Sequence, residues 1–458
     1  MKAILIAAAT SGCGKTTFTM GLLRTLRERG LRVQPFKCGP DYIDPIYHRM
    51  ASGRESVNLD TFMSSPDHVR ELFHRYGADA DICVIEGAMG LFDGADGPRG
   101  SAAEVAQLLD VPVLLLVSAK SVAYSVAPLI YGFRHFNPNV RISGVVFNFV
   151  ASERQYATLQ RACADAGIPC LGYLHRNPEL TIPSRHLGLT IKEEEEVERL
   201  IQRAAESVAD LELDIAPYTP SALPVHKESS VSSRTGRAEG ESRESESLLV
   251  ARDAAFNFTY RANLDALRQL GKVTFFSPLR DSVLPPCDIL YLPGGYPELF
   301  AEQLAANTLL RSSIRDFAES GGCILAECGG FMYLCQDIDG TPMCGVLPLS
   351  ATMQNARLHL GYRQMTLDGQ LIRGHEFHYS SIRDLAQPST PQLPTASLST
   401  ASPFTDPSSS ITRLCNQETA TGDPVPTPLY RYKNVVAGYT HWYWADNPLT
   451  TLSLLLNL

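Results

Sequence analysis

The sequence predicts an α/β protein with two domains, the first built on a parallel sheet covered by helices. Its 458 residues are too many for one domain of ordinary size, so a small binding module is excluded. Short apolar, β-rich runs alternate with longer amphipathic stretches in both halves of the chain, as in sheets flanked by helices. A polar stretch with few apolar residues separates the two halves and predicts a flexible linker.

Five apolar runs in the first half predict strands, and each precedes a longer amphipathic or turn-bounded stretch. These runs are Ala3–Ala9, Arg32–Phe36, Ile82–Ile85, Val113–Val117 and Ile142–Phe147. A helix over Lys192–Val208 is expected to close this domain, which we place at residues 1–226. Its acidic run, Glu193–Glu196, is typical of a solvated helix face.

The second domain is expected at residues 248–458, after a linker at 227–247. A Ser/Thr/Pro-rich stretch at 386–428 is too poor in core residues for an ordinary loop, and we interpret it as a surface insertion. The predicted strands of this domain are Leu248–Ala251, Val273–Phe276, Ile289–Leu292 and Cys323–Ala326.

The composition excludes several classes of function. The chain has 49 acidic and 40 basic residues, and this balance argues against nucleic acid as the main partner. No apolar run reaches the roughly 18 residues that a membrane helix needs. The 11 cysteines are scattered without metal-ligand spacing, so we expect reduced thiols in a cytoplasmic protein.

The segment Ala9–Thr16 has the pattern of a phosphate-binding P-loop, with alanine in place of the usual first glycine. It follows an apolar strand and precedes the helical run Thr17–Arg29, which is where the mechanism requires it. Lys15 would neutralise the β- and γ-phosphates of a nucleotide, and the Thr16 hydroxyl would bind Mg²⁺. An incidental glycine-rich turn is the alternative. The predicted nucleotide-binding residues here are Gly12, Gly14, Lys15, Thr16 and Thr17.

Polar residues follow other predicted strands of the same sheet. Glu86 ends an apolar strand, where a P-loop fold places a second acid that organises Mg²⁺. Asp93 either belongs to the same site or caps a turn. Asp41 and Tyr42 lie in a polar cluster after the second strand, and Asn148 follows a strand from which an amide could reach the purine.

The run from Gly321 to Met332 predicts a nucleophile elbow, because an apolar strand leads into Cys328 between small residues and then into a helical stretch. A helix N-terminus beneath the sulfur would lower the pKa of the Cys328 thiol and favour the thiolate. A buried structural thiol is the alternative, and it is the usual fate of a cysteine.

Two further features complete this second constellation. Gly294 and Gly295 follow a predicted strand, and their backbone N–H groups could form an oxyanion hole; a plain turn is the alternative. A thiol nucleophile needs a base, and the candidates are His441, His375 and His378. Spacing along the chain does not choose among these histidines.

The two constellations, in this order, resemble the cobyrinate a,c-diamide synthase family, glutamine amidotransferases of corrinoid biosynthesis. The resemblance extends over nearly the whole chain apart from the two low-complexity stretches. It implies a dethiobiotin-synthetase-like P-loop domain followed by a class I glutamine amidotransferase-like domain. The most specific matching segments are Phe36–His48, Val84–Gly94, Arg176–Leu189, Ala251–Tyr260, Leu292–Glu298, Ala326–Leu334 and Gly374–Ser380.

The resemblance implies that L-glutamine is hydrolysed at one site and that the ammonia is used at the other. There ATP, as co-substrate with Mg²⁺, would phosphorylate the a and c acetate carboxylates of cobyrinate in turn, and ammonia would displace phosphate. This agrees with the chemistry of the two constellations, because a carboxylate is inert to ammonia until its oxygen becomes a leaving group.

By position, the resemblance makes Cys328 the nucleophile and favours His441 as its base. It assigns Asp41, Tyr42, Glu86 and Asp93 to the synthetase site, with Thr16, Asp41 and Glu86 as expected metal ligands. One departure concerns the third member of the triad. Class I amidotransferases usually carry a carboxylate two residues after the histidine, and this chain has Tyr443 there. The acid is therefore either absent or supplied elsewhere, with Glu376 a weak candidate.

Three alternatives stay open at this point. The metal-free hydrogenobyrinate and the nickel sirohydrochlorin a,c-diamide synthases share the same motifs. A regulatory P-loop ATPase is a more distant alternative, against which the thiol elbow argues, as does Thr10, where that group usually carries a second lysine. A homodimer is compatible with the sequence, and neither nucleic acid nor a membrane is expected as a partner.

Overall fold

The computed structural model describes residues 1–180, 182, 191–209, 211, 246–384 and 411–456. The chain forms two compact units, one of Met1–Arg243 with Tyr260–Ala262 and one of Glu244–Thr259 with Asn263–Leu458. The predicted linker at 227–247 lies outside the described residues apart from its last two, which begin a strand. The exact domain boundaries therefore stay predictions.

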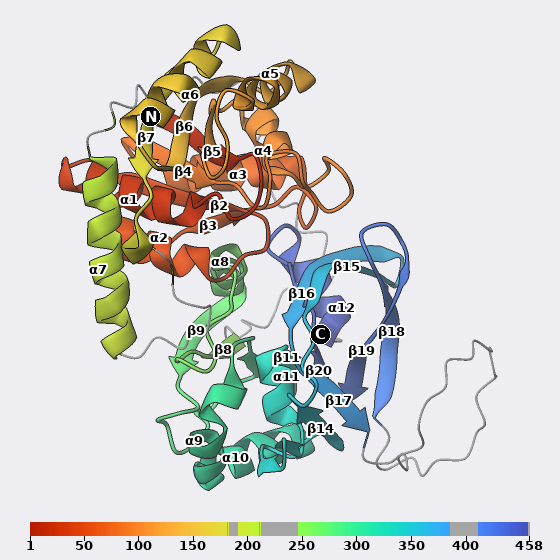
Figure 1. Ribbon diagram of the computed structural model, residues 1–458. Helices are drawn as coiled ribbons and strands as arrows, with labels where there is room; N and C mark the ends of the chain where they lie inside the picture. Colours follow the sequence, from red (N-terminus) through yellow and green to blue (C-terminus); the bar gives the residue numbers. More distant parts are fainter. Residues whose placement is uncertain (181, 183–190, 210, 212–245, 385–410, 457–458) are drawn as a thin grey trace. The chain divides into compact units, whose positions relative to one another are not determined.

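Among the described residues of the first unit, seven strands form one parallel sheet in the order β3-β2-β4-β1-β5-β6-β7 (Figure 1). All five strands predicted in this half are present, and the predictions missed β3 and β7. The strands are β1 (Lys2–Ala8), β2 (Val33–Cys38), β3 (Val57–Leu59), β4 (Ile82–Glu86), β5 (Val113–Ser118), β6 (Ile142–Val150) and β7 (Cys170–His175).

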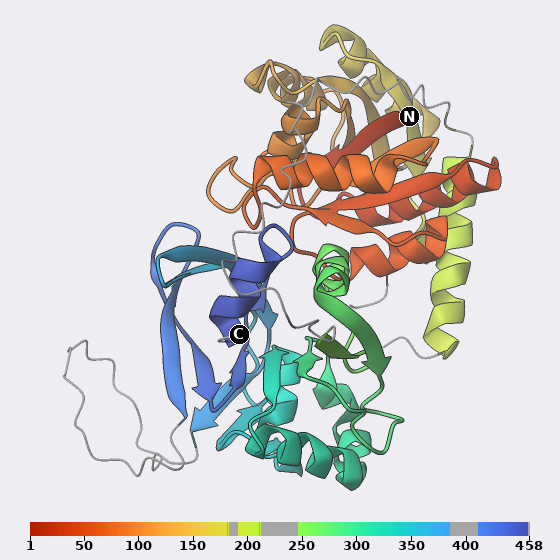
Figure 2. The ribbon, with the colours of Figure 1, turned by 180° about the vertical axis from the view of Figure 1, so that it is seen from behind.

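Helices cover both faces of this sheet, as the figure and its reverse view show (Figure 2). The core on one face joins alternate residues of β1, such as Ile4 and Ile6, to Phe18 of α1 and Ile201 of α7. That face carries α1 (Lys15–Glu28), α2 (Asp44–Ser52) and α7 (Ile191–Val208). The opposite face carries α3 (Pro66–Gly77), α4 (Ala102–Leu109), α5 (Val126–Phe136) and α6 (Glu153–Asp165), and the short 3₁₀ helix η1 (Pro178–Leu180) follows β7.

Among the described residues of the second unit, ten strands form a mixed sheet in the order β21-β16-β15-β18-β19-β20-β11-β10-β8-β9. The run from β20 to β9 is parallel and contains every strand predicted for this domain. The other half is antiparallel. The strands are β8 (Glu246–Ala251), β9 (Gly271–Phe276), β10 (Ile289–Leu292), β11 (Cys323–Glu327), β15 (His359–Leu367), β16 (Gln370–His378), β18 (Thr412–Glu418), β19 (Pro424–Tyr432), β20 (Val435–Gly438) and β21 (His441–Trp442).

The central strands of the parallel half, β10, β11 and β20, are buried on both faces, whereas the edge strand β9 is largely exposed. Ile324 and Ala326 of β11 belong to one core cluster, whereas Leu325 between them belongs to another. This alternation is the two-residue period of a strand with both faces covered. The remaining elements are α8 (Arg261–Leu270), η2 (Pro297–Phe300), α9 (Ala301–Ala306), α10 (Thr308–Glu319), α11 (Gly329–Leu334), α12 (Pro448–Leu456) and a small sheet of β12 (Asp337–Ile338), β13 (Thr341–Pro342), β14 (Leu349–Thr352) and β17 (Ser381–Asp384).

The insertion predicted at 386–428 needs correction. Residues 385–410 lie outside the described part of the chain, but 412–428 belong to the antiparallel pair β18 and β19. The expectation of an insertion rested on a Ser/Thr/Pro-rich composition that is poor in core residues. However, β19 pairs with β20 only through Tyr430–Tyr432, so Pro424, Pro426 and Pro428 lie where a backbone N–H toward β20 is not needed.

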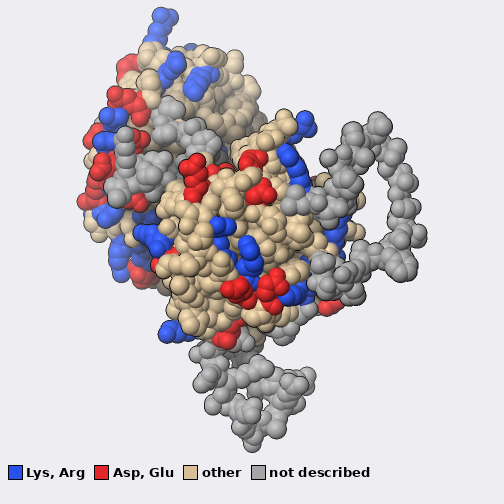
Figure 3. All heavy atoms as spheres, turned by 90° about the horizontal axis from the view of Figure 1, so that it is seen from below, with Lys and Arg blue, Asp and Glu red and all other residues tan. Residues whose placement is uncertain are grey.

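No helix in the part of the chain that the structure describes is long and apolar enough to cross a membrane. On the face drawn in Figure 3, basic and acidic side chains are interspersed rather than gathered into one area. The expected absence of a nucleic-acid partner stays a prediction.

Candidate active site

The predicted P-loop connects β1 to α1 and depends on two glycines. Gly12 and Gly14 have φ angles of 77° and 86°, in the left-handed region that favours glycine. A Cβ on Gly14 would also lie 2.3 Å from Nδ2 of Asn148. Gly14 is thus required both for its backbone angle and for the close approach of β6.

The side chains that follow the loop contact the end of β4. Thr16 Oγ1 donates to Glu86 Oε1 over 2.9 Å, and Lys15 Nζ donates to the carbonyl of Met89 over 2.5 Å. Burial, reinforced by the nearby charge of Lys37, lowers the pKa of Lys15. Thr17 instead donates to the carbonyl of Leu180 over 3.4 Å.

Asn148 is placed next to the loop, although not free of it. Its Nδ2 donates to the carbonyl of Cys13 over 2.8 Å, and its Oδ1 accepts from the N–H of Phe149 over 2.8 Å. The amide therefore holds the loop against β6, and its contact with a purine stays a prediction.

A buried group of charges lies at the ends of β2 and β4, with Lys37 at its centre. Its Nζ lies 2.6 Å from Asp44 Oδ2, 3.0 Å from Glu86 Oε1 and 3.9 Å from Asp41 Oδ2. Lys37 and Glu86 are direct partners in the parallel register of β2 and β4. Strand pairing thus brings together two residues that are 49 positions apart.

Burial and charge oppose each other in this group. Burial alone would lower the pKa of Lys37, but the carboxylates of Asp44, Glu86 and Asp41 outweigh it and raise that pKa. Burial would raise the pKa of Glu86, but Lys37 and a hydrogen bond from His48 hold it well below its usual range. Asp44 is the reverse case, because burial and the charge of Asp41 raise its pKa.

The predicted site residues did not include Lys37, Asp44 or His48, although Lys37 and Asp44 lie in the polar cluster noted after the second strand. His48 Nε2 lies 2.7 Å from Glu86 Oε2, and its Nδ1 lies 3.1 Å from the Ser56 hydroxyl. The available signals were the position of Lys37 near the end of a strand and the four-residue spacing of Asp44 and His48, which places both on one face of α2.

The structure places the other predicted synthetase residues as follows. Asp41 lies next to Lys37, and its Oδ1 also accepts from the N–H groups of Ile43 and Asp44 at the start of α2. Tyr42, the next residue in the chain, is buried. Asp93 Oδ2 accepts from the N–H of Gly90 over 3.0 Å, which is the turn-capping contact that sequence reasoning had left open.

In the second unit, Cys328 occupies a sharp turn between β11 and α11. Its φ and ψ angles are 47° and −106°, which are unusual for a residue with a side chain. A Cβ on Gly330 would lie 2.1 Å from the carbonyl of Leu292, and one on Gly329 would lie 2.9 Å from the N–H nitrogen of Gly295. Only glycines allow this turn, so the elbow geometry expected from the sequence is present.

The pKa of the Cys328 thiol is raised, contrary to the expectation of a favoured thiolate. Burial is the largest cause, and the charge of Glu298 adds to it. Hydrogen bonds from the backbone N–H groups of Gly329 and Gly295 act in the opposite direction but do not outweigh burial. The helix after Cys328 spans only Gly329–Leu334, and the raised pKa favours the protonated thiol.

The two predicted oxyanion-hole glycines differ in what they do. The N–H of Gly295 faces the sulfur, together with the N–H of Gly329, which the predictions missed. A Cβ on Gly294 would lie 2.1 Å from Cε1 of His441, so this glycine makes room for the imidazole. Cys328 and His441 therefore both lie against the turn after β10.

His441 is buried, and its surroundings keep it neutral. Burial, followed by the charges of His375 and His378, lowers its pKa to about 3. A neutral imidazole can accept a proton, which is what the predicted base must do. Burial also raises the pKa of Glu298, next to the turn, to about 7.

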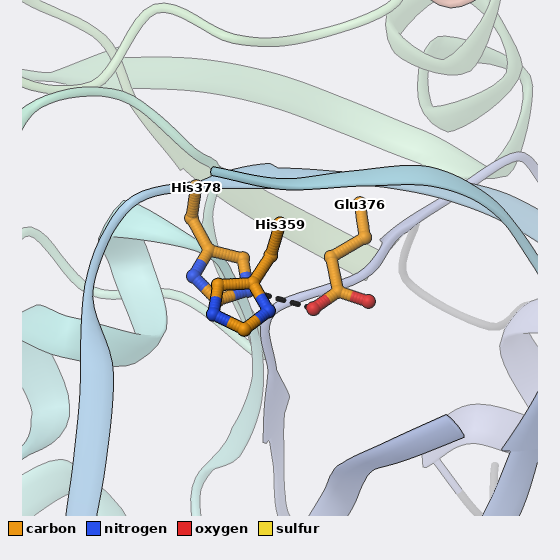
Figure 4. A group of neighbouring side chains, drawn as sticks. All are labelled: His359, Glu376 and His378. Carbon is orange, nitrogen blue, oxygen red and sulfur yellow. Dashed lines mark hydrogen bonds and ion pairs between the residues drawn. The ribbon is translucent and has the colours of Figure 1, made fainter. Parts of the chain in front are cut away.

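His378 and Glu376 belong to a different network (Figure 4). His378 Nε2 lies 2.6 Å from Glu376 Oε1, which also accepts from the Thr427 hydroxyl over 2.9 Å, and Arg363 binds the other carboxylate oxygen. Glu376, the weak candidate for the triad acid, is thus occupied by these partners.

The ligand atoms of His359, Glu376 and His378 lie within 4.8 Å of one another, as a metal site would require. However, His378 Nδ1 faces the carbonyl of Ser380 at 2.8 Å while its Nε2 faces a carboxylate. Both ring nitrogens thus already have hydrogen-bond partners, and a metal ion would have to displace one of them. We therefore interpret this group as a hydrogen-bonded network.

We predict that iodoacetamide alkylates Cys328 slowly at neutral pH, with a rate that rises about tenfold per pH unit because only the thiolate reacts. Cys170 is the internal control, because a hydrogen bond from Cys163 lowers its pKa and it is half-buried. Its alkylation should approach a plateau near neutrality. Peptide mapping by mass spectrometry measures both rates, and a Cys328 rate that levels off near pH 7 would contradict the raised pKa.

Comparison with known proteins places each unit in a described family. Residues 4–189 match the CobQ/CobB/MinD/ParA nucleotide binding domain, and residues 247–448 match the CobB/CobQ-like glutamine amidotransferase domain. Among solved structures, a glutamine amidotransferase is 16% identical over 46% of this chain and 99% of that chain, with a TM-score of 0.30, a likeness too weak to place the fold.

Curated relatives resemble the chain over most of its length. A hydrogenobyrinate a,c-diamide synthase from Brucella abortus is 42% identical over 83% of this chain and 90% of the relative. One from Streptomyces coelicolor is 39% identical over 82% of this chain and 86% of the relative. A cobyrinate a,c-diamide synthase from Listeria monocytogenes is 41% identical over 83% of this chain and 87% of the relative. At this identity and coverage, the chain belongs to the family of the cobyrinate and hydrogenobyrinate a,c-diamide synthases.

Proposed function

We propose that this protein converts the a and c acetate carboxylates of cobyrinate to carboxamides, with ATP as the activating co-substrate and L-glutamine as the nitrogen donor. The observation that carries the proposal is the presence of two complementary sites on one chain. One is a phosphate loop whose Thr16 reaches an acidic strand end, and the other is a thiol elbow. Family membership supports the same conclusion.

At the glutaminase site, His441 takes the proton of the Cys328 thiol as the sulfur attacks the side-chain carboxamide of glutamine. The N–H groups of Gly295 and Gly329 stabilise the oxyanion of the tetrahedral intermediate. His441 then gives its proton to the leaving ammonia, and water hydrolyses the thioester to glutamate. The raised pKa of the thiol makes the base necessary, because little thiolate exists before the substrate binds.

At the synthetase site, the acceptor carboxylate attacks the γ-phosphate of ATP and ADP leaves; ammonia then displaces phosphate from the acyl phosphate to give the carboxamide. Lys15 binds the phosphates after it leaves the carbonyl of Met89. Lys37, close to Glu86 and Asp44, supplies positive charge at the same edge of the sheet. We assign Asp41 and Tyr42 to the acceptor side of this site, and the turn at Asp93 flanks it.

The oxygen donors at this edge fit Mg²⁺, which prefers hydroxyl and carboxylate oxygens together with phosphates. Thr16 Oγ1 and Asp41 Oδ2 are the atoms we propose as ligands. Both oxygens of Glu86 already have partners in Thr16, Lys37 and His48, so Glu86 would act chiefly by orienting Thr16. When bound, the ion would neutralise charge on the transferring phosphoryl group.

Hydrogenobyrinate, the metal-free macrocycle, is the second candidate acceptor. The relatives from Brucella and Streptomyces carry that name, whereas the Listeria relatives are named for cobyrinate. Identities of 39% to 42% do not separate the two groups. A nickel tetrapyrrole has no comparable support among these relatives. A homodimer and a cytoplasmic location stay predictions.

The glutaminase assignment predicts that Cys328→Ala abolishes glutamine-dependent amidation, by at least about 10³-fold, because no nucleophile remains. Amidation with ammonium chloride should stay within about twofold of the wild type, since the synthetase site is unchanged. Steady-state rates with each nitrogen donor provide the measurement. Equal loss with both donors would argue against two separate sites.

The synthetase assignment predicts that Glu86→Gln lowers amidation with both nitrogen donors by about 10² or more, because Thr16, Lys37 and His48 lose a shared anionic partner. Glutamine hydrolysis without acceptor should persist. Asp81→Asn is the matched control, since Asp81 precedes the same strand at its other end and forms an exposed pair with Arg32. Loss of activity in both variants would point to damage of β4 rather than of the site.

Mass spectrometry of the products distinguishes the acceptors. With ATP, Mg²⁺ and glutamine, we expect cobyrinate to gain two amide groups, while nickel sirohydrochlorin does not react. A faster reaction of hydrogenobyrinate would favour the second candidate. ATP hydrolysis that no tetrapyrrole stimulates, with no amide formed, would favour a regulatory ATPase.

A further inference from the structure

We propose that Glu327 is the carboxylate that positions His441, in place of the acid that is missing two residues after that histidine. The inference rests on the glutaminase function proposed for Cys328. Glu327 acts through His441 and does not itself touch glutamine, so it is a positioning residue.

The geometry points to Glu327 because the fold holds it beside the imidazole. Its Oε2 lies 3.9 Å from Nδ1 of His441. Glu327 ends β11, pairs with Gly438 of β20 in the parallel register, and points to the same face of the sheet as Leu325. The residue before the nucleophile and the strand before the base are therefore neighbours.

Two hydrogen bonds fix the carboxylate in this position. Oε1 accepts from the backbone N–H of Trp442 over 3.0 Å, and Oε2 accepts from the hydroxyl of Tyr291 over 2.7 Å. The first bond ties Glu327 to the residue directly after His441. The carboxylate is thus aligned by the segment that carries the base, and a small shift would bring Oε2 within hydrogen-bond distance of Nδ1, as is common when a substrate binds.

Burial explains why His441 needs a carboxylate beside it. Both side chains are buried, and a lone charge there is costly: burial raises the pKa of Glu327 to about 8 and lowers that of His441 to about 3. Proton transfer from Cys328 creates an imidazolium at this buried position. A carboxylate beside it that has already lost its proton to solvent offsets that cost, whereas neither charge is stable there alone.

The other titratable groups that face His441 do not fill this role. His375, its partner on β16, and His378 are cationic when charged and lower the pKa of His441. Glu376 raises it, but only as the smallest contribution, and Arg363, His378 and Thr427 already bind its oxygens. Among the described residues, the carboxylate within ion-pair distance of His441 is Glu327.

The test compares Glu327→Gln with Glu319→Gln in the full-length protein. The glutamine side chain can keep the bonds to Trp442 and Tyr291 while it removes the charge. We expect kcat for glutamine hydrolysis to fall by about 10² to 10⁴, the range seen when a triad acid is neutralised, with KM within about threefold. Glu319 forms an exposed pair with Lys433, so its variant should match the wild type.

The pH profile separates this role from a purely structural one. Ionised Glu327 is the active form, so wild-type kcat/KM should rise with pH and show an inflection near pH 8, which Glu327→Gln should lack. Ammonia-dependent amidation should survive in that variant, which shows that the chain is folded. Glu327→Asp restores the charge, so its kcat should be at least about tenfold higher than that of Glu327→Gln.

Three results would overturn the proposal: a Glu327→Gln variant within threefold of the wild type, an unchanged inflection, or an aspartate variant no more active than the glutamine variant. The aspartate comparison also decides the case if Glu327→Gln folds poorly. A wild-type protein that does not hydrolyse glutamine would instead defeat the proposed function itself, which the Cys328→Ala comparison reveals separately.

Discussion

Both sites depend on the pairing of parallel strands, which places the ends of distant segments at one edge of a sheet. In the first unit, β4 lies between β2 and β1, so Glu86 meets Lys37 on one side and Thr16, just after the loop that follows β1, on the other. In the second unit, β11 lies between β10 and β20, so Cys328 lies close to both Gly295 and the segment leading to His441. Local turns then determine which groups face the reacting atoms.

Burial sets the chemistry of these edges, and neighbouring charge decides its direction. Lys37 stays protonated because three carboxylates outweigh its desolvation. In the second unit, burial is the largest influence on the pKa values of Cys328, Glu327 and His441, and it favours the neutral form of each. At the first edge, Lys37 and Glu86 keep opposite charges, which suit the binding of phosphate and metal ions. At the second edge, charge on the buried thiol or imidazole is costly, so the proposed proton transfer depends on a neighbouring carboxylate.

Local patterns account for much of what sequence reasoning found. Most of the predicted parallel strands have apolar runs that the fold buries, and the P-loop and elbow both need small residues directly after a strand. The antiparallel half of the second sheet was less predictable. Its strand β19 contains three prolines, which a strand can accommodate only where no neighbour needs their missing N–H groups. How far β20 extends beside β19 decides this, and the sequence of β19 does not show it.

By itself, the sequence determined the α/β class and the family, and it located the P-loop segment and the cysteine that we propose as nucleophile, because each depends on residues adjacent in the chain. Only the tertiary structure decided that Lys37 and His48 bind Glu86, that Asp93 caps a turn, that Glu376 belongs to another network and that Glu327 lies beside His441. It also reversed the expected pKa of Cys328. The physical reason is the same throughout: burial and charge pairing depend on neighbours brought together by the fold, and such neighbours leave no local pattern in the sequence.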